Sequence, residues 1–219
     1  MPEDPRKRLV EAGYDRMAEK YLASKEPDDP MTIAALEELA SRLPKSASVL
    51  DLGCGAGLPA ARWLAERYST VGVDISGRQI ELAKNNAPNA RFIKSDMASL
   101  GFEPGIFDAV VAFVSIIHVP REEHAGVFER IHGWLKNGGY FLATLSVGEW
   151  EGEEGDWEGW GAAMWWSHHD GEENLKMLRD AGFAVVSAEA KSGKGTGDEK
   201  EMWLWVLARK LEQGAKHER

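Results

Sequence analysis

The chain has 219 residues, of which 43% are hydrophobic and 28% are charged. This length suits one domain with a core large enough to fold without disulfides or structural metals. The one cysteine, Cys54, excludes an intramolecular disulfide and any site built from paired thiolates. With 26 basic and 36 acidic residues the formal net charge is −10, which argues against a nucleic-acid partner.

The sequence carries no signal for a membrane. No apolar run approaches the ~20 residues of a membrane span, and residues 1–10 lack the apolar core of a secretory signal. We therefore expect a cytoplasmic protein with no membrane partner, and we find no indication of its oligomeric state.

Two helices are expected before the first strand. Apolar residues recur at helical spacing over residues 6–24, and Pro27 and Pro30 exclude a longer helix. A second helix is expected over residues 31–43. Residues 1–45 are thus predicted to form an N-terminal helical cap.

From residue 46 the apolar pattern alternates between strand and helix. Strands are predicted over residues 48–52, 70–74, 91–94, 107–114 and 140–145, with helices over 58–67, 76–86 and 121–136. Strands separated by helices imply right-handed crossovers and a doubly wound, mostly parallel sheet. The predicted fold class is α/β, a single domain over residues 1–219 whose cofactor-binding core spans residues 46–146.

Three more elements are expected toward the C-terminus. Asp170 and Glu173 have the spacing of a capping box, which predicts a helix over residues 171–181. Strands are predicted over residues 183–190 and 201–208, joined by a glycine-rich stretch at residues 191–198. Residues 171–210 are therefore expected to form a C-terminal helix and strand pair.

The most informative segment is VLDLGCGAG at residues 49–57. A strand that runs into G-x-G-x-G and then a helix brings bare backbone to a place where a nucleotide approaches closely. A side chain at Gly53 or Gly55 is expected to occupy the space of that ligand. A glycine motif alone also fits a tight turn without a ligand, so the following strands carry the argument.

An acidic residue ends each of the next two strands. Asp74 lies 21 residues after Gly53, where a carboxylate can accept both ribose hydroxyls. Asp96 is placed to accept a hydrogen bond from an adenine amino group, with the backbone of Met97 beside it. Three such features at consecutive strand ends predict an adenosyl cofactor.

Two residues indicate which adenosyl cofactor this is. A dinucleotide fingerprint has glycine at its sixth position, where this chain has Leu58. Asp51 stands two residues before the loop, where a carboxylate meets a cation rather than a phosphate. S-adenosylmethionine has an α-ammonium and no phosphate. The sequence therefore favours a protein that uses S-adenosylmethionine over two alternatives, a nicotinamide-dependent oxidoreductase and a non-catalytic adenosyl-binding regulatory module.

Residues 49–146 resemble the core of the class I S-adenosylmethionine-dependent methyltransferases, in the small-molecule group of type 11/25-like methyltransferase domains. The matching segments are VLDLGCGAG, VGVDIS, ARFIKSDM, FDAVVAFVSIIHVP and WLKNGGYFLATL. The resemblance implies a Rossmann-like, seven-stranded sheet of order 3-2-1-4-5-7-6 with its last strand antiparallel. It also implies S-adenosylmethionine as the cofactor and S-adenosylhomocysteine as the product.

The same resemblance implies which residues hold the cofactor. The methionine part is expected at Asp51, Gly53 and Gly55, the ribose and adenine at Asp74 and Ile75, and the adenine edge at Asp96 and Met97. Further cofactor contacts are expected at Cys54 and Phe113. Tyr14 and Tyr21 are similar to positions on an N-terminal helix that covers the cofactor in many small-molecule methyltransferases, although both also fit core packing.

Methyl transfer is an in-line displacement at an activated methyl group, so the protein mainly aligns the reactants and excludes water. His118 follows the fourth predicted strand, and its imidazole titrates near neutral pH, so it is a candidate general base. A histidine here fits a hydrogen bond to a loop carbonyl equally well. Tyr21 and His168 are the other candidate catalytic residues.

Residues 147–170 are predicted to form a lid that is rich in tryptophan and acidic residues. Tryptophan binds a flat or cationic acceptor by stacking or cation–π contact, and the predicted substrate contacts are His118, Trp165, Trp166 and His168. A solvated acidic loop with tryptophans at its base fits the same composition. No metal is expected. The predicted function is methyl transfer to a small aromatic or heterocyclic acceptor.

Overall fold

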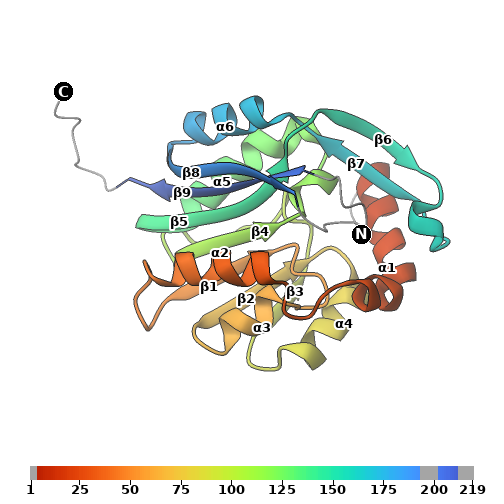
Figure 1. The fold of residues 1–219 in the computed structure, drawn as a ribbon, viewed down its shortest axis with the longest axis horizontal. Coiled ribbons are helices and arrows are strands. Elements are labelled where there is room, and N and C mark those ends of the chain that lie inside the picture. The colour runs from red at the N-terminus through yellow and green to blue at the C-terminus, as the bar shows by residue number, and fades with distance from the viewer. Residues whose placement is uncertain (1–3, 193–201, 212–219) are drawn as a thin grey trace.

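The computed structural model describes residues 4–192 and 202–211, beginning with two helices (Figure 1). α1 spans Pro5–Ser24 and α2 spans Pro30–Ala40. Asp4 and Asp29 precede them, and each side chain accepts a hydrogen bond from a backbone N–H in the first turn. Proline then opens each helix at a position where its missing N–H costs nothing. Both helices expected before the first strand therefore form.

A seven-stranded sheet occupies the centre of the molecule (Figure 1). Its strands are β1 (Ser48–Leu52), β2 (Ser69–Asp74), β3 (Arg91–Lys94), β4 (Phe107–Phe113), β5 (Leu135–Ser146), β8 (Phe183–Ser192) and β9 (Met202–Lys210). Their order is β3-β2-β1-β4-β5-β9-β8, and β9 is antiparallel to both neighbours. Counted within this sheet alone, the order is 3-2-1-4-5-7-6 with the last strand antiparallel, so the predicted fold is confirmed.

The remaining helices connect these strands. They are α3 (Ala60–Ala65), α4 (Gly77–Asn86), α5 (His124–Trp134) and α6 (Gly171–Asp180), with short 3-10 turns η1 (Ile116–His118), η2 (Arg121–Glu123) and η3 (Trp157–Gly159). The helix expected over residues 121–136 is shorter, because its first turn is 3-10 and the backbone is already extended at Leu135. Leu135 pairs with Phe107, so β5 begins five residues before the strand predicted at residue 140.

The predicted lid contains an antiparallel hairpin that sequence reasoning did not foresee. β6 (Trp150–Glu154) pairs with β7 (Met164–His168) in a separate two-stranded sheet. Met164 and Trp166 of β7 are buried together with Trp157 and with Met17 of α1. The tryptophans therefore pack the hairpin onto the first helix, and acidic side chains such as Glu154 are exposed.

Two apolar layers cover the two faces of the sheet. Leu50, Val110 and Phe141 pack with α5 and α6 on one face. Val49 and Val111 pack with α2 and α3 on the other. Since side chains alternate along a strand, each central strand contributes to both layers and reads as a continuous apolar run.

No helix within residues 4–192 and 202–211 is long and apolar enough to cross a membrane. Most of the glycine-rich stretch predicted at residues 191–198 lies outside these residues, as does residue 201, where the last strand was predicted to begin.

Candidate active site

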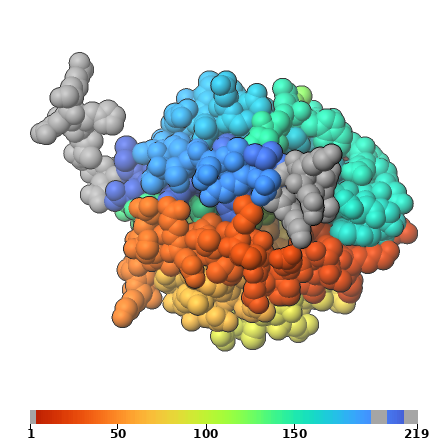
Figure 2. All heavy atoms as spheres, viewed as in Figure 1, coloured from red at the N-terminus to blue at the C-terminus, as the bar shows by residue number. Residues whose placement is uncertain are grey.

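Two cavities adjoin at the carboxyl ends of the parallel strands. The first has a volume of ≈ 670 Å³ and reaches Asp74 and Asp96, whereas the second has ≈ 1150 Å³ and reaches Asp51. Both are lined by Gly53 and Val114, so one elongated ligand can extend from one cavity into the other. Figure 2 shows the N-terminal segment, in red and orange, running across the molecule beneath the later strands and beside the hairpin, in cyan-green.

The glycine loop has left-handed backbone at both predicted positions, with φ of +72° at Gly53 and +52° at Gly55. A Cβ at Gly53 would collide with the Cβ of Ser115 and lie 2.8 Å from its Oγ. The predicted reason for this glycine is therefore corrected, because Ser115 excludes a side chain before any ligand does. A Cβ at Gly55 would meet no atom closer than Oε1 of Gln79 at 4.0 Å, and would enter the cavity.

Asp74 fixes this loop. Its carboxylate accepts hydrogen bonds from the backbone N–H groups of Gly55 and Ser76, both at 2.9 Å. Burial raises the pKa of Asp74 to about 6, although these two hydrogen bonds lower it. A carboxylate oxygen has more than one acceptor site, so the ribose contact predicted for Asp74 stays a prediction that its geometry allows.

Asp51 carries an unsatisfied buried oxygen. The residue is 2% exposed, and its Oδ2 has no hydrogen-bond partner among the described residues. Burial and the charge of Asp74 raise the pKa of Asp51 to about 7. A buried acceptor without a partner is costly, and Asp51 lines the second cavity next to Gly53 and Gly55. The site therefore fits a cationic ligand group such as an α-ammonium.

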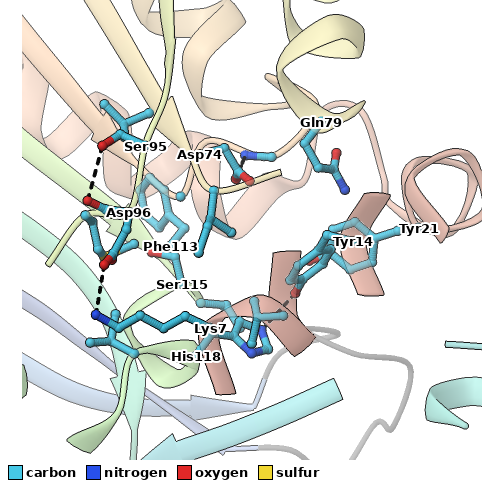
Figure 3. A pocket seen from close by; sticks show the side chains of 18 residues that line it. Lys7, Tyr14, Tyr21, Asp74, Gln79, Ser95, Asp96, Phe113, Ser115 and His118 are labelled. Atoms are coloured by element: carbon cyan, nitrogen blue, oxygen red, sulfur yellow. Dashed lines mark hydrogen bonds and ion pairs between the residues drawn. The ribbon is translucent and has the colours of Figure 1, made fainter. Parts of the chain in front are cut away.

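Asp96 has a partner that the sequence did not indicate. Nζ of Lys7 donates to its Oδ2 at 2.8 Å (Figure 3). The same Nζ also donates to Oε2 of Glu123 at 2.6 Å. Burial alone would lower the pKa of Lys7, but these two hydrogen bonds outweigh it and the pKa lies above its usual value. Ile75 and Met97 line the same cavity, so the predicted adenine wall lies beside an ion pair from α1.

Gln79 is a cavity residue that sequence reasoning missed. It is 1% exposed, and neither atom of its side-chain amide has a partner among the described residues. It points toward the space beside Asp74 (Figure 3). The available signal was its place on the buried face of the helix after Asp74, next to Ile80 and Ala83.

A hydrogen-bonded chain joins α1 to the hairpin through His118. Its Nδ1 lies 2.8 Å from the carbonyl oxygen of Trp165. Its Nε2 lies 2.8 Å from the hydroxyl of Tyr14 (Figure 3). A carbonyl only accepts, so Nδ1 carries the proton and Nε2 accepts from Tyr14. Burial lowers the pKa of His118 to about 4 and raises that of Tyr14 well above its usual value.

The other residues predicted to contact the acceptor lie in the hairpin next to His118. The Trp166 ring is 4.5 Å from the His118 ring, and Trp165 supplies the carbonyl described above. His168 hydrogen-bonds the carbonyl oxygen of Gly148 at 2.7 Å, at the base of the hairpin. None of Trp165, Trp166 and His168 lines either cavity, so their contact with the acceptor stays a prediction.

Tyr14 and Tyr21 do line the first cavity, with ring centroids 5.3 Å apart. Cys54 is buried and lines the second cavity, and Phe113 lines both. Within residues 4–192 and 202–211, no group of three histidine, cysteine or acidic residues is arranged to hold a metal ion.

Comparison with known proteins shows which domain and which fold this chain resembles. Residues 49–139 match a family model described as a methyltransferase domain. A solved S-adenosylmethionine-dependent methyltransferase from Methanosarcina mazei superposes with a TM-score of 0.71 at 23% identity, covering 80% of this chain and 98% of that one. This chain is therefore similar to a methyltransferase domain over residues 49–139, and its fold is similar to that of S-adenosylmethionine-dependent methyltransferases.

The curated relatives are longer proteins, and this chain matches only a part of each. Phosphoethanolamine N-methyltransferase 3 of Arabidopsis thaliana is 29% identical over 170 residues, which cover 75% of this chain and 32% of that protein. The sterol 24-C-methyltransferase of Debaryomyces hansenii is 38% identical over 100 residues, covering 42% of this chain and 26% of that protein. The chain thus spans about a third of the length of the curated relatives it matches first.

Proposed function

We propose that this chain transfers the methyl group of S-adenosylmethionine to a small aromatic or heterocyclic acceptor by in-line displacement. The observation that carries the proposal is the buried, unpartnered Oδ2 of Asp51, which lines the second cavity beside Gly53 and Gly55. A carboxylate in this position would bind the α-ammonium, and Asp74, Asp96 and Gln79 would bind the adenosine part in the first cavity. The bound cofactor supplies a methyl group that is activated by its attachment to a sulfonium.

The chain contributes alignment and water exclusion more than proton transfer. His118 with a pKa of about 4 is a weak base at neutral pH, and its Nε2 already accepts from Tyr14. Tyr14 lines the first cavity, and its hydroxyl oxygen, which donates to His118, can also accept a hydrogen bond from the methyl acceptor. An acceptor that gains a methyl group becomes more acidic, so its proton can pass late to the hydroxyl oxygen of Tyr14 while the Tyr14 proton passes to Nε2 of His118, and no strong base is needed.

Aromatic side chains support an aromatic or heterocyclic acceptor. Tyr14, Tyr21 and Phe113 line the first cavity, while Trp203 and Trp205 line the second. Such rings bind flat molecules by stacking. The curated relatives carry names of nitrogen and carbon methyltransferases with small acceptors, which supports a small acceptor for this chain too.

The test combines binding with turnover. Calorimetry with S-adenosylhomocysteine is expected to show one site, weakened by Asp74→Ala and unchanged by Asp180→Ala, whose exposed side chain pairs with Lys176 on α6. Release of S-adenosylhomocysteine is then measured with phenols, heteroaromatic amines, thiols, tertiary amines and quinones. Turnover confined to flat acceptors would support the proposal. Absence of cofactor binding, or binding that Asp74→Ala leaves unchanged, would overturn it, and turnover of non-aromatic acceptors alone would overturn the acceptor class.

A further inference from the structure

Three side chains form a row on the floor of the second cavity. Thr144 of β5 is paired with Trp205 of β9, and Trp203 lies two residues before Trp205. Residues paired across antiparallel strands, and residues two apart along a strand, share one face of a sheet. Phe113 of β4 pairs with Thr144, and its ring centroid lies 5.9 Å from that of Trp205. The row therefore runs outward from Phe113 toward the start of β9.

Each of the three side chains ends in a hydrogen-bonding group without a partner. Oγ1 of Thr144 and Nε1 of both Trp203 and Trp205 are buried and make no hydrogen bond with any residue in the described ranges. Thr144 is 1% exposed and Trp203 is 8% exposed. A buried indole N–H only donates, and leaving it unpaired is costly. Three such groups along one cavity wall indicate that their partner is a ligand.

The charges around this cavity restrict the ligand further. Besides Asp51, which the proposed function pairs with the cofactor ammonium, its lining carries the carboxyl groups of Glu26 and Asp29 and the single amine of Lys25. The Lys25 amine lies 4.4 Å from the centre of the Tyr21 ring. An anionic ligand would meet a net negative surface, whereas an uncharged oxygen accepts from the indole N–H groups without that repulsion.

Resting on the proposed function, we infer that Thr144, Trp203 and Trp205 form the acceptor subsite and select an uncharged aromatic compound with a carbonyl or ring oxygen. The rings of Phe113 and Trp205 contact the flat body of this compound. The indole N–H groups donate to its oxygen atoms. The group that receives the methyl lies at the other end, toward Tyr14 and the cofactor loop.

Binding of two matched probes tests the subsite without turnover. Coumarin is an uncharged bicycle with two acceptor oxygens and no donor, and indole is a bicycle of similar size with one donor and no acceptor oxygen. Each is titrated into the full chain saturated with S-adenosylhomocysteine and labelled with ¹⁵N at tryptophan. The chain has nine tryptophans, and Trp203→Phe and Trp205→Phe assign the two indole signals of interest by their loss.

Coumarin is expected to shift both signals and to bind at least tenfold more tightly than indole. Thr144→Val keeps the shape of the wall and removes one polar hydrogen. Trp203→Phe and Trp205→Phe each remove one polar hydrogen and also part of the ring surface, so the preference for coumarin over indole, and not the affinity for either probe alone, is the readout. Each variant is expected to reduce the preference for coumarin about 3- to 10-fold, as for the loss of one neutral hydrogen bond. Trp150→Phe, at a tryptophan 46% exposed on the hairpin, is the matched control and should leave the preference unchanged.

Two results would overturn the inference. One is equal affinity of coumarin and indole, or a preference that the three variants leave intact. The other is a full shift of both indole signals by S-adenosylhomocysteine alone with no further shift by coumarin, which would assign these donors to the cofactor. Failure of S-adenosylhomocysteine to bind in the same samples would instead refute the proposed function, so the two failures are distinguishable.

Discussion

Replacing Asp51 with asparagine is expected to make the protein more stable and its cofactor site weaker. The buried carboxyl has its pKa raised from 3.8 to about 7, so the folded state holds this proton where the unfolded state has lost it. Between these two values the free energy of unfolding falls as the pH rises, and above pH 7 the loss is complete. At 1.36 kcal/mol for each pH unit, the full loss is about 4 kcal/mol.

An asparagine side chain has no carboxyl to ionise, so Asp51→Asn removes this loss. The variant is expected to exceed the native chain in unfolding free energy by about 2 kcal/mol at pH 5.5 and about 4 kcal/mol at pH 8. Urea denaturation followed by tryptophan fluorescence at both pH values measures the gap. Asp180→Asn, on the exposed side of α6, controls for the loss of one negative charge.

The same substitution should weaken cofactor binding although it raises the unfolding free energy. Asp51→Asn exchanges a charged acceptor for a neutral one, so affinity for S-adenosylhomocysteine at pH 8 is expected to fall about 10- to 100-fold. A stability gap that does not grow with pH would refute the electrostatic reasoning. A variant that gains stability and keeps its full affinity would show that Asp51 does not hold the ammonium.

Three further variants test the site. Gly53→Ala should lower the unfolding free energy by about 2 kcal/mol or more in urea denaturation, because the added methyl group meets Ser115. Adding Ser115→Gly should recover part of this loss. An unchanged unfolding free energy in the single variant would contradict the clash. Tyr14→Phe is expected to lower kcat about 10- to 100-fold. The double variant with His118→Asn should have a kcat no lower than that of the worse single variant, because the two side chains act as one hydrogen-bonded pair. Additive losses of kcat would contradict this. Lys7→Met should weaken S-adenosylhomocysteine binding about 3- to 10-fold in calorimetry by releasing the carboxylate beside the adenine wall, and full affinity would remove Lys7 from the site.

The sheet could be predicted because each of its parallel strands has a local signature. Val49 and Leu50 are apolar on both faces of β1, and the glycine loop marks the point where the strand ends. The hairpin had no such signature. Its acidic residues resemble a solvated loop, and the segment is held by strand pairing and by the packing of Trp157 and Trp166 against α1.

The residues expected to hold the cofactor follow from chain order, whereas the residues proposed to hold the acceptor do not. Asp51 and Asp74 stand at fixed distances from the glycine loop, and parallel strands bring their ends to one edge. The contacts of Lys7 with Asp96, and of Trp205 with the second cavity, join segments far apart in the sequence. The alternation in β9 put Trp203 and Trp205 on one face, but the face that meets the cavity depends on pairing with β5.

The placement of α1 has a thermodynamic consequence for the order in which ligands bind. α1 contacts the loop that follows β2, where Oγ of Ser76 donates a hydrogen bond of 2.6 Å to Oδ1 of Asp15. The same helix reaches His118 through Tyr14. A cofactor that fixes α1 therefore also fixes the side chain that faces the acceptor. Linkage requires the reverse as well, so each ligand should tighten the other by the same factor. A first helix that lies outside the matched domain is thus expected to couple the binding of the two ligands.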